Sequence, residues 1–307
     1  MSGSGYVGRF APSPTGRLHI GSLLAAVASW CDARHHGGQW LVRMEDLDPP
    51  REVPGAADDI LRTLESFGFE WDGETVKQSK RHDKYEDALK FLQSSGMAFG
   101  CGCSRRDLQG AAVYPGTCRG GIPSGKQERL QRFLLGKGVE SWNDLILGRL
   151  EFRREELGDF PILRADGFWA YQLAVVVDDR DQGITHVVRG SDLLDSTPRQ
   201  LAIWKALQGD MGPEIPEYGH LPVLTNSLGQ KLSKQTMARA VDASSACEQI
   251  DFVWRCLGQN AEDEAWRDLM KAGHAHDLLR RGAELWSRNR VPRQSIPLQG
   301  WAQEDAV

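Results

Sequence analysis

Two short stretches, far apart in the chain, carry residues suited to holding a nucleotide triphosphate. The first is "HIGS", from His19 to Ser22, which begins a run of small apolar residues typical of a helix. The second is "SLGQKLSKQ", a glycine-containing segment with Lys231 and Lys234. A helix N-terminus presents free backbone N–H groups and a partial positive charge to a phosphate. Lysines on another loop can stabilise the charge that develops on a departing pyrophosphate.

Each residue of this pair of motifs has an expected role. His19 would stabilise the α-phosphate as the reacting phosphorus becomes pentacovalent, and Ser22 would add a hydroxyl. Lys231 and Lys234 would hold the distal phosphates. Either motif alone is typical of solvated surface, and Gly21 with Ser22 could simply start a helix. The two motifs together, in this order, favour nucleotide chemistry, with His19, Ser22 and Lys234 as catalytic residues and Gly21 and Lys231 as further nucleotide contacts.

The elements that must position these residues begin with a strand–helix–strand unit. Strands are expected over residues 6–11 and 40–44, and a helix over residues 22–36 that Gly37 and Gly38 terminate. A helix that joins two strands in this way indicates a right-handed crossover and a parallel sheet. The expected fold class is therefore α/β.

Further segments show patterns of both kinds. Apolar spacing predicts helices over residues 58–67 and 82–95. The run "FWAYQLAVVVDD", residues 168–179, is rich in β-forming side chains and is expected to be a strand. "THVVRGSDLL", residues 185–194, is expected to be another strand that ends in a charged loop. Ser196 is placed to cap a following helix.

The chain divides into four expected parts. Residues 1–98 and 161–235 would form the two halves of an α/β domain. Between them the regular pattern breaks up, and the cysteine- and glycine-rich segment 99–160 would be an insertion. Residues 236–307 are expected to form a small helical region.

The composition excludes several classes of protein. Of the 307 residues, 40% are hydrophobic and 26% are charged, as in ordinary soluble domains. The net charge of −5 argues against a protein that coats nucleic acid non-specifically. No apolar run is long enough to cross a bilayer, and the first residues do not resemble a secretion signal, so a cytoplasmic protein without a membrane partner is expected.

Three cysteines form a candidate metal site. Cys101, Cys103 and Cys118 are close in sequence, whereas six cysteines in the whole chain are too few for a disulfide scaffold. In a reducing compartment such clustering favours zinc, which takes four tetrahedral ligands. No histidine lies between Asp83 and His186, so the spacing leaves the fourth ligand open, with water or Asp107 as candidates. Three free thiols are the alternative.

A series of motifs in one order resembles the class I aminoacyl-tRNA synthetases. "HIGS" and "KLSKQ" look like the two signature motifs of that class, and "GRFAPSPTGRLHIG", "RMEDLDPPR", "QSKRHDKYEDAL", "AYQLAVVVDD" and "VVRGSDLLDSTPRQ" narrow the resemblance to the glutamyl branch. The match covers about residues 5–235. It departs from the family's motifs at Ser22, Leu232 and Gln235, where histidine, methionine and serine are usual.

The resemblance implies a Rossmann-type, doubly wound parallel sheet that uses ATP, with Mg²⁺, to activate glutamate. It also implies a pocket for the three charges of glutamate. Glu45 would take the ammonium group, while Arg9 and Arg189 would take the carboxylates in the two-pronged geometry that arginine offers. Tyr171 and Ser13 would add hydroxyl groups. The other expected glutamate contacts, beside Ser13 in the loop after the first strand, are Phe10, Ala11 and Pro12. The alternative is that Arg9 and Glu45 pair with each other at the surface.

The length points to a shorter group of paralogues within this branch. Only 73 residues follow Lys234, too few for the large helical domain with which the long enzymes read the anticodon. The cysteine-rich insertion also resembles these paralogues, which implies Tyr114 as the fourth ligand of one structural zinc. Members of that group activate glutamate without tRNA and attach it to the cyclopentenediol of queuosine in the anticodon of tRNA(Asp).

Two other functions remain open from the sequence. One is a short glutamyl-tRNA synthetase that charges a tRNA 3′ end. The other is a non-catalytic, zinc-bearing RNA-binding module, which the presence of both nucleotide motifs argues against.

Overall fold

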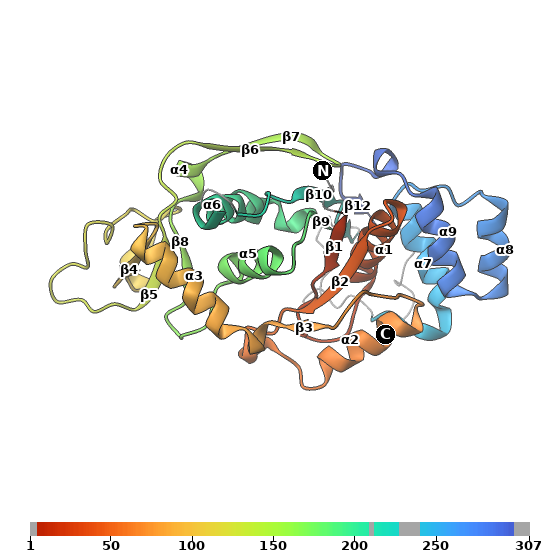
Figure 1. Ribbon diagram of the computed structural model, residues 1–307, viewed down its shortest axis with the longest axis horizontal. Coiled ribbons are helices and arrows are strands. Elements are labelled where there is room, and N and C mark those ends of the chain that lie inside the picture. Colours follow the sequence, from red (N-terminus) through yellow and green to blue (C-terminus); the bar gives the residue numbers. More distant parts are fainter. Residues whose placement is uncertain (1–4, 209–211, 227–239, 298–307) are drawn as a thin grey trace.

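The computed structural model describes residues 5–208, 212–226 and 240–297. Its centre is a parallel sheet (Figure 1). Strand β1 (Val7–Phe10) pairs with β2 (Gln39–Met44), which pairs with the short β3 (Val76–Lys77). On the other side of β1 lies β9 (His186–Gly190), which pairs in parallel with β10 (Glu217–Leu221). The chain order therefore reverses between β1 and β9, as in doubly wound sheets.

Helices cover both faces of this sheet. Consecutive residues of a strand point to opposite faces, and Val188 belongs to the hydrophobic cluster around helix α1 (Ile20–His35). Its neighbour Val187 packs in a separate cluster with Leu201 of helix α6 (Thr197–Gln208). The expected crossover from β1 through α1 to β2 is confirmed, although α1 begins two residues before the predicted start at Ser22.

The prediction of a strand over residues 168–179 is wrong. This segment forms helix α5 (Tyr171–Asp181), which packs against α6 and helix α3 (His82–Ser94). Residues 173–179 are all buried, so no polar face marks the helical period. The apolar run at residues 173–177 fits a buried helix as well as a buried strand, and the valines that suggested β structure here satisfy a packing requirement.

The segment expected as an irregular insertion contains regular strands. A three-stranded antiparallel sheet consists of β4 (Ala98–Cys101), β5 (Leu130–Phe133) and β8 (Phe160–Leu163). A hairpin of β6 (Val139–Asp144) and β7 (Gly148–Arg153) returns toward β10. Figure 1 shows this sheet at one end of the molecule, with the hairpin running back along its upper edge.

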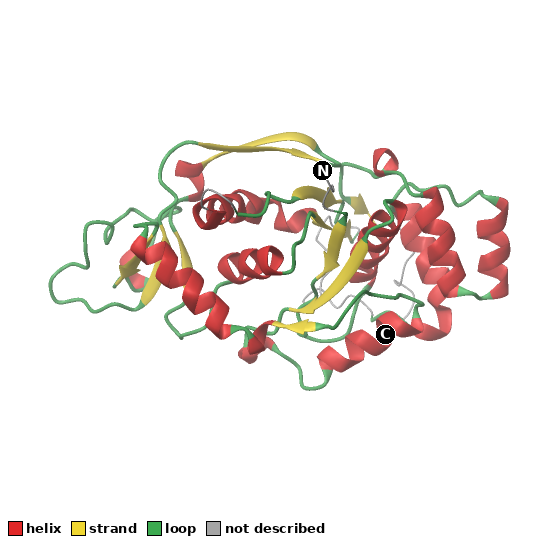
Figure 2. Ribbon diagram, viewed as in Figure 1, coloured by secondary structure: helices red, strands yellow, loops and turns green. Residues whose placement is uncertain are grey.

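Helices dominate the described residues after 240 (Figure 2). Helices α7 (Ala246–Cys256) and α9 (Ala275–Leu285) pack directly on α1, and α8 (Glu264–Ala272) packs on both of them. Along the described chain, no helix combines the length and apolarity needed to cross a membrane. The remaining helices and strands are α2 (Ala56–Ser66), α4 (Arg154–Leu157), β11 (Leu224–Thr225) and β12 (Ile296–Pro297), with short 3-10 turns at Pro49–Arg51, Gln78–Lys80, Arg106–Leu108, Ser191–Ser196, Ala243–Ser245 and Arg288–Arg290.

Candidate active site

A cavity of about 1130 Å³ opens where β1, β2 and β9 end. Ligands of open α/β sheets bind at this edge, beside the point where the strand order reverses. The structure brings together here every described residue that was predicted to contact nucleotide or glutamate. These lining residues are Arg9, Phe10, Ala11, Pro12, Ser13, His19, Gly21, Ser22, Glu45, Tyr171 and Arg189. Lys231 and Lys234, like the departures Leu232 and Gln235, lie outside the described residues.

His19 occupies the N-cap position of α1, at the cavity wall. Its Nδ1 accepts a hydrogen bond from the backbone N–H of Ser22 at 3.2 Å, and its Nε2 lies 3.3 Å from Ser22 Oγ. An isolated bridge pairs His19 with Ala240, just after the lysine-bearing segment. Because His19, Gly21 and Ser22 all line the cavity, the N-terminus of α1, with its partial positive charge, faces it.

A network of buried ion pairs lies behind Arg9 and Glu45 of the cavity wall. Arg43 Nη2 lies 2.7 Å from Asp179 Oδ1, and Arg9 Nε lies 3.4 Å from the same oxygen. Glu45 contacts Arg43 at 3.4 Å. Arg9 is 4% exposed, so the alternative of an Arg9–Glu45 surface pair does not describe this site. The sequence interpretation missed Arg43 and Asp179, although a charge inside the apolar strand "WLVRM" signals a buried partner.

The carboxyl group of Glu45 has an unusual affinity for protons. Burial raises its pKa to about 7, against the lowering effect of the nearby Arg43 and Arg9 guanidinium groups. A cation that binds beside Glu45 would lower this pKa and so favour the ionised carboxylate. This is the behaviour expected of a residue that binds an ammonium group.

Arg189 is held by three polar side chains. Its Nη1 donates to Tyr171 Oη at 3.2 Å on the cavity side, and its Nη2 donates to Thr197 Oγ1 at 2.7 Å. Its Nε lies 3.4 Å from Nε2 of His220, which in turn contacts Asp144. His220, Thr197 and Asp144 were not predicted, because nothing near them in sequence marks a contact with Arg189.

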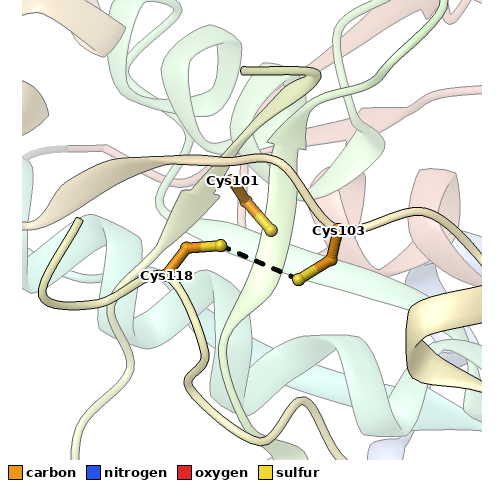
Figure 3. Close-up of side chains that lie close together, drawn as sticks. All are labelled: Cys101, Cys103 and Cys118. Carbon is orange, nitrogen blue, oxygen red and sulfur yellow. Dashed lines mark hydrogen bonds between the residues drawn. The ribbon is translucent and has the colours of Figure 1, made fainter. Parts of the chain in front are cut away.

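The three predicted cysteine ligands meet within the insertion. The sulfur atoms of Cys101, Cys103 and Cys118 all lie within 4.8 Å of one another, and the three side chains point to a common centre (Figure 3). All three are free thiols rather than disulfide partners. Tyr114 Oη lies 3.4 Å from Cys101 Sγ and 4.0 Å from Cys103 Sγ. The phenol implied by the resemblance is thus at the cluster.

The donor set fits a tetrahedral zinc ion. Zn–S bonds near 2.3 Å separate two sulfur ligands by about 3.8 Å, and the Cys103 and Cys118 sulfur atoms lie 3.7 Å apart. Asp107, the other candidate ligand, instead accepts hydrogen bonds from Ser104 and pairs with Lys126. Of the two protein groups considered for the fourth position, the geometry favours Tyr114.

Comparison with known proteins finds a matching family model and several similar proteins. Residues 6–112 and 125–253 match the family model described as tRNA synthetases class I (E and Q), catalytic domain. A protein from Chromobacterium violaceum named glutamyl-Q tRNA(Asp) synthetase is 51% identical over 97% of this chain and 99% of its own length. Proteins of the same name from Dechloromonas aromatica and Neisseria meningitidis are 51% and 48% identical, each over at least 95% of both chains.

A solved structure resembles the whole fold. The glutamate tRNA ligase of Elizabethkingia meningosepticum, determined in complex with its amino acid, aligns with a TM-score of 0.79 at 22% identity. The alignment covers 96% of this chain and 67% of that protein. At this identity the likeness concerns the fold, and it agrees with the doubly wound sheet described above.

Proposed function

The chain belongs to the class I tRNA synthetases (E and Q), and we propose that it activates glutamate with ATP and transfers it to queuosine in tRNA(Asp). Activation would need no tRNA, and the acceptor would be the cyclopentenediol of queuosine in the anticodon. Relatives that match over nearly their whole length, at 48–51% identity, are named glutamyl-Q tRNA(Asp) synthetase. The observation that carries the proposal is that the start of α1, Arg9, Arg189 and Glu45 line one and the same cavity.

The first step joins glutamate to the nucleotide. Glu45 would bind the ammonium group, while Arg9 and Arg189 would bind the carboxylates of glutamate. A glutamate α-carboxylate oxygen attacks the α-phosphorus of ATP, and the bond from that phosphorus to the bridging oxygen of pyrophosphate breaks. His19 and Ser22 would stabilise the pentacovalent phosphorus, and Lys231 with Lys234 the departing pyrophosphate.

The second step transfers the acyl group. A hydroxyl of the cyclopentenediol attacks the carbonyl carbon of the adenylate, and the bond from that carbon to the phosphate oxygen breaks. AMP leaves, and its phosphate takes up the hydroxyl proton. The product is a glutamyl ester on the modified base. The acceptor belongs to an unpaired loop nucleotide, whose base can be splayed out toward a pocket. An anticodon loop would therefore enter the same cavity that forms the adenylate.

Bound ions would have separate roles. Mg²⁺ accompanies ATP and neutralises part of the phosphate charge. One Zn²⁺ held by Cys101, Cys103, Tyr114 and Cys118 would cross-link the insertion and take no part in the reaction, because four protein ligands leave no open position. The chain would accordingly have four parts. Residues 1–98 and 161–235 would form the two halves of the catalytic domain, residues 99–160 the zinc-bearing insertion, and residues 236–307 a small helical region.

Two measurements test this function. Glutamate-dependent ATP–pyrophosphate exchange should proceed without tRNA. tRNA(Asp) that carries queuosine should then accept labelled glutamate, and the ester should survive removal of the 3′-terminal adenosine. The same tRNA with unmodified guanosine should remain uncharged. Charging of tRNA(Glu) at its 3′ end would instead identify a short glutamyl-tRNA synthetase, and RNA binding without exchange would identify a binding module.

A further inference from the structure

A chain of buried polar side chains connects the hairpin of the insertion with the glutamate pocket. Asp144 ends strand β6, and its Oδ1 accepts hydrogen bonds from the backbone N–H groups of Ile146, Leu147 and His220 at 3.0–3.1 Å. Its Oδ2 lies 2.5 Å from His220 Nδ1. Both side chains are completely buried. Segments far apart in the sequence therefore meet at one carboxylate.

The hydrogen-bond pattern determines which nitrogen of His220 carries a proton. The three backbone N–H groups require Asp144 to act as an acceptor, which favours its ionised form. Burial opposes ionisation, yet the hydrogen bond from His220 and those from the backbone hold the pKa of Asp144 below its ordinary value. The Nδ1 of His220 must then be the donor in the short contact between the two side chains.

The other ring nitrogen faces Arg189. Nε2 of His220 lies 2.9 Å from Thr197 Oγ1 and 3.4 Å from Arg189 Nε. Burial lowers the pKa of His220, against the raising effect of Asp144 and with help from the Arg189 charge. The ring is thus neutral and presents a lone pair to a guanidinium group, whereas a proton on Nε2 would oppose one N–H donor with another.

Arg189 is consequently fixed from behind. Nε faces His220, and Nη2 donates to Thr197 and to the carbonyl of Leu193. Nη1 is left toward the cavity, beside the hydroxyl of Tyr171. Because a planar guanidinium binds a carboxylate well only in a narrow range of orientations, its rear contacts control its affinity.

We propose that Asp144 and His220 are positioning residues that orient Arg189 to bind a carboxylate of glutamate, an inference that rests on the proposed function. Asp144 holds the Nδ1–H tautomer of His220, and that tautomer accepts from Arg189. The β6–β7 hairpin then contributes to amino-acid recognition, independently of the cysteine cluster at the far end of the insertion.

The tautomer can be measured without any ligand. A long-range ¹H–¹⁵N spectrum of the whole protein should show His220 neutral, with the proton on Nδ1. In Asp144→Asn the new amide can donate to Nδ1, so the proton should move to Nε2. His220 protonated on Nε2 in the unchanged protein would overturn the proposal, whether or not the variant folds.

Kinetics distinguish positioning from packing. In ATP–pyrophosphate exchange, Asp144→Asn should raise KM for glutamate on the order of tenfold to a hundredfold, with kcat and KM for ATP little changed. His220→Asn, which can reach Asp144 but not Arg189, should behave alike. His220→Gln, whose side-chain oxygen can replace the Nε2 lone pair, should recover much of the loss. The matched control is Glu151→Gln, the same acid-to-amide change on an exposed side chain of the same hairpin.

The outcomes separate this proposal from the proposed function. If the unchanged protein shows no glutamate-dependent exchange, the function is wrong, whatever the His220 spectrum shows. If exchange is normal and KM for glutamate is the same in Asp144→Asn and the control, the positioning role is wrong. Equal KM values for the two His220 variants would also reject it, because simple loss of packing predicts that result.

Discussion

The imidazole of His19 caps the helix that it precedes, because its Nδ1 accepts from the backbone N–H of Ser22 at 3.2 Å. A neutral ring with an accepting Nδ1 carries its proton on Nε2, 3.3 Å from Ser22 Oγ. That proton can be donated to the Ser22 oxygen, which leaves the hydroxyl hydrogen of Ser22 to face the cavity. The serine that replaces the family's usual histidine thus still provides a donor.

The cap and the phosphate contact of His19 can be separated by substitution. His19→Ala should lower the free energy of unfolding by about 1 kcal/mol through loss of the cap. It should also slow exchange by about 10²–10³, the usual cost of one donor to a developing charge. His19→Asn restores a good capping residue but not the ring, so its stability should recover while exchange stays slow. Recovery of both properties would assign His19 a structural role only.

Glutamate binding should depend on pH through Glu45. The pKa of this carboxyl is raised to about 7 by burial, and only the ionised form attracts an ammonium group. KM for glutamate should therefore rise by about tenfold per pH unit below that value. Glu45→Gln should have a high KM that no longer changes with pH between roughly 6 and 8. A pH-independent KM in the unchanged protein would contradict the assigned role.

Glu45 should also make the stability of the protein depend on pH, so that stability falls with rising pH while glutamate binding improves. The folded protein holds a proton on Glu45 up to about pH 7, whereas the unfolded chain releases it near the ordinary value of 4.5. The contribution of Glu45 to the free energy of unfolding should therefore fall as the pH rises through this window. Chemical denaturation of the protein and of Glu45→Gln across this range measures the difference.

The cysteine cluster should hold about one zinc ion per chain, the expectation for a single four-ligand site. Elemental analysis of Cys103→Ser should show reduced metal content, with exchange activity retained because the cluster lies apart from the cavity. Tyr114→Phe removes only the phenolic oxygen, so it tests the fourth ligand. An unchanged rate of zinc loss to a chelator in that variant would assign the fourth position to water.

The role of Lys234 can be tested by substitution and kinetics. Lys234→Ala should slow adenylate formation by about 10²–10³, with KM for glutamate little changed, because the lysine meets charge that develops on the departing pyrophosphate. Single-turnover measurement of adenylate would detect this directly. An unchanged rate would remove this lysine from the mechanism.

Asp32 should be a major source of stability in the C-terminal part of the fold. This buried carboxylate accepts from Trp286 Nε1 at 2.8 Å and from Arg288 at 2.7 and 2.9 Å, and also from Tyr6 Oη. Burial opposes its charge, but these partners hold the pKa of Asp32 below its ordinary value. Its contribution is therefore present above the unfolded pKa and lost as the pH falls through the folded one.

Replacing that carboxylate tests the network. Asp32→Asn should cost about 3–5 kcal/mol in the free energy of unfolding, because it leaves Arg288 without its buried partner. Asp268→Asn, the same change on an exposed side chain of α8, should have little effect. A similar loss in both variants would show that the network does not support the fold.

Local patterns in the sequence determined the β1–α1–β2 unit and the chemical groups at the site. The small residues after His19 and the glycines after His36 define α1 without reference to the rest of the chain. The spacing of Cys101, Cys103 and Cys118 likewise brings three thiols within reach of one ion, since it lies in a short segment. The resemblance to the synthetase family supplied the pocket residues that spacing alone could not connect.

Only the tertiary structure decided the secondary structure of residues 168–179 and the partners of Arg189. The short apolar run at residues 173–177 suits a buried helix and a buried strand equally, so packing against α3 and α6 made the choice. His220 lies opposite Arg189 because β10 pairs with β9, and Asp144, 76 residues away from His220, reaches it only where the hairpin folds back onto β10. Such contacts leave no local periodicity in a sequence, because they depend on how distant elements pack.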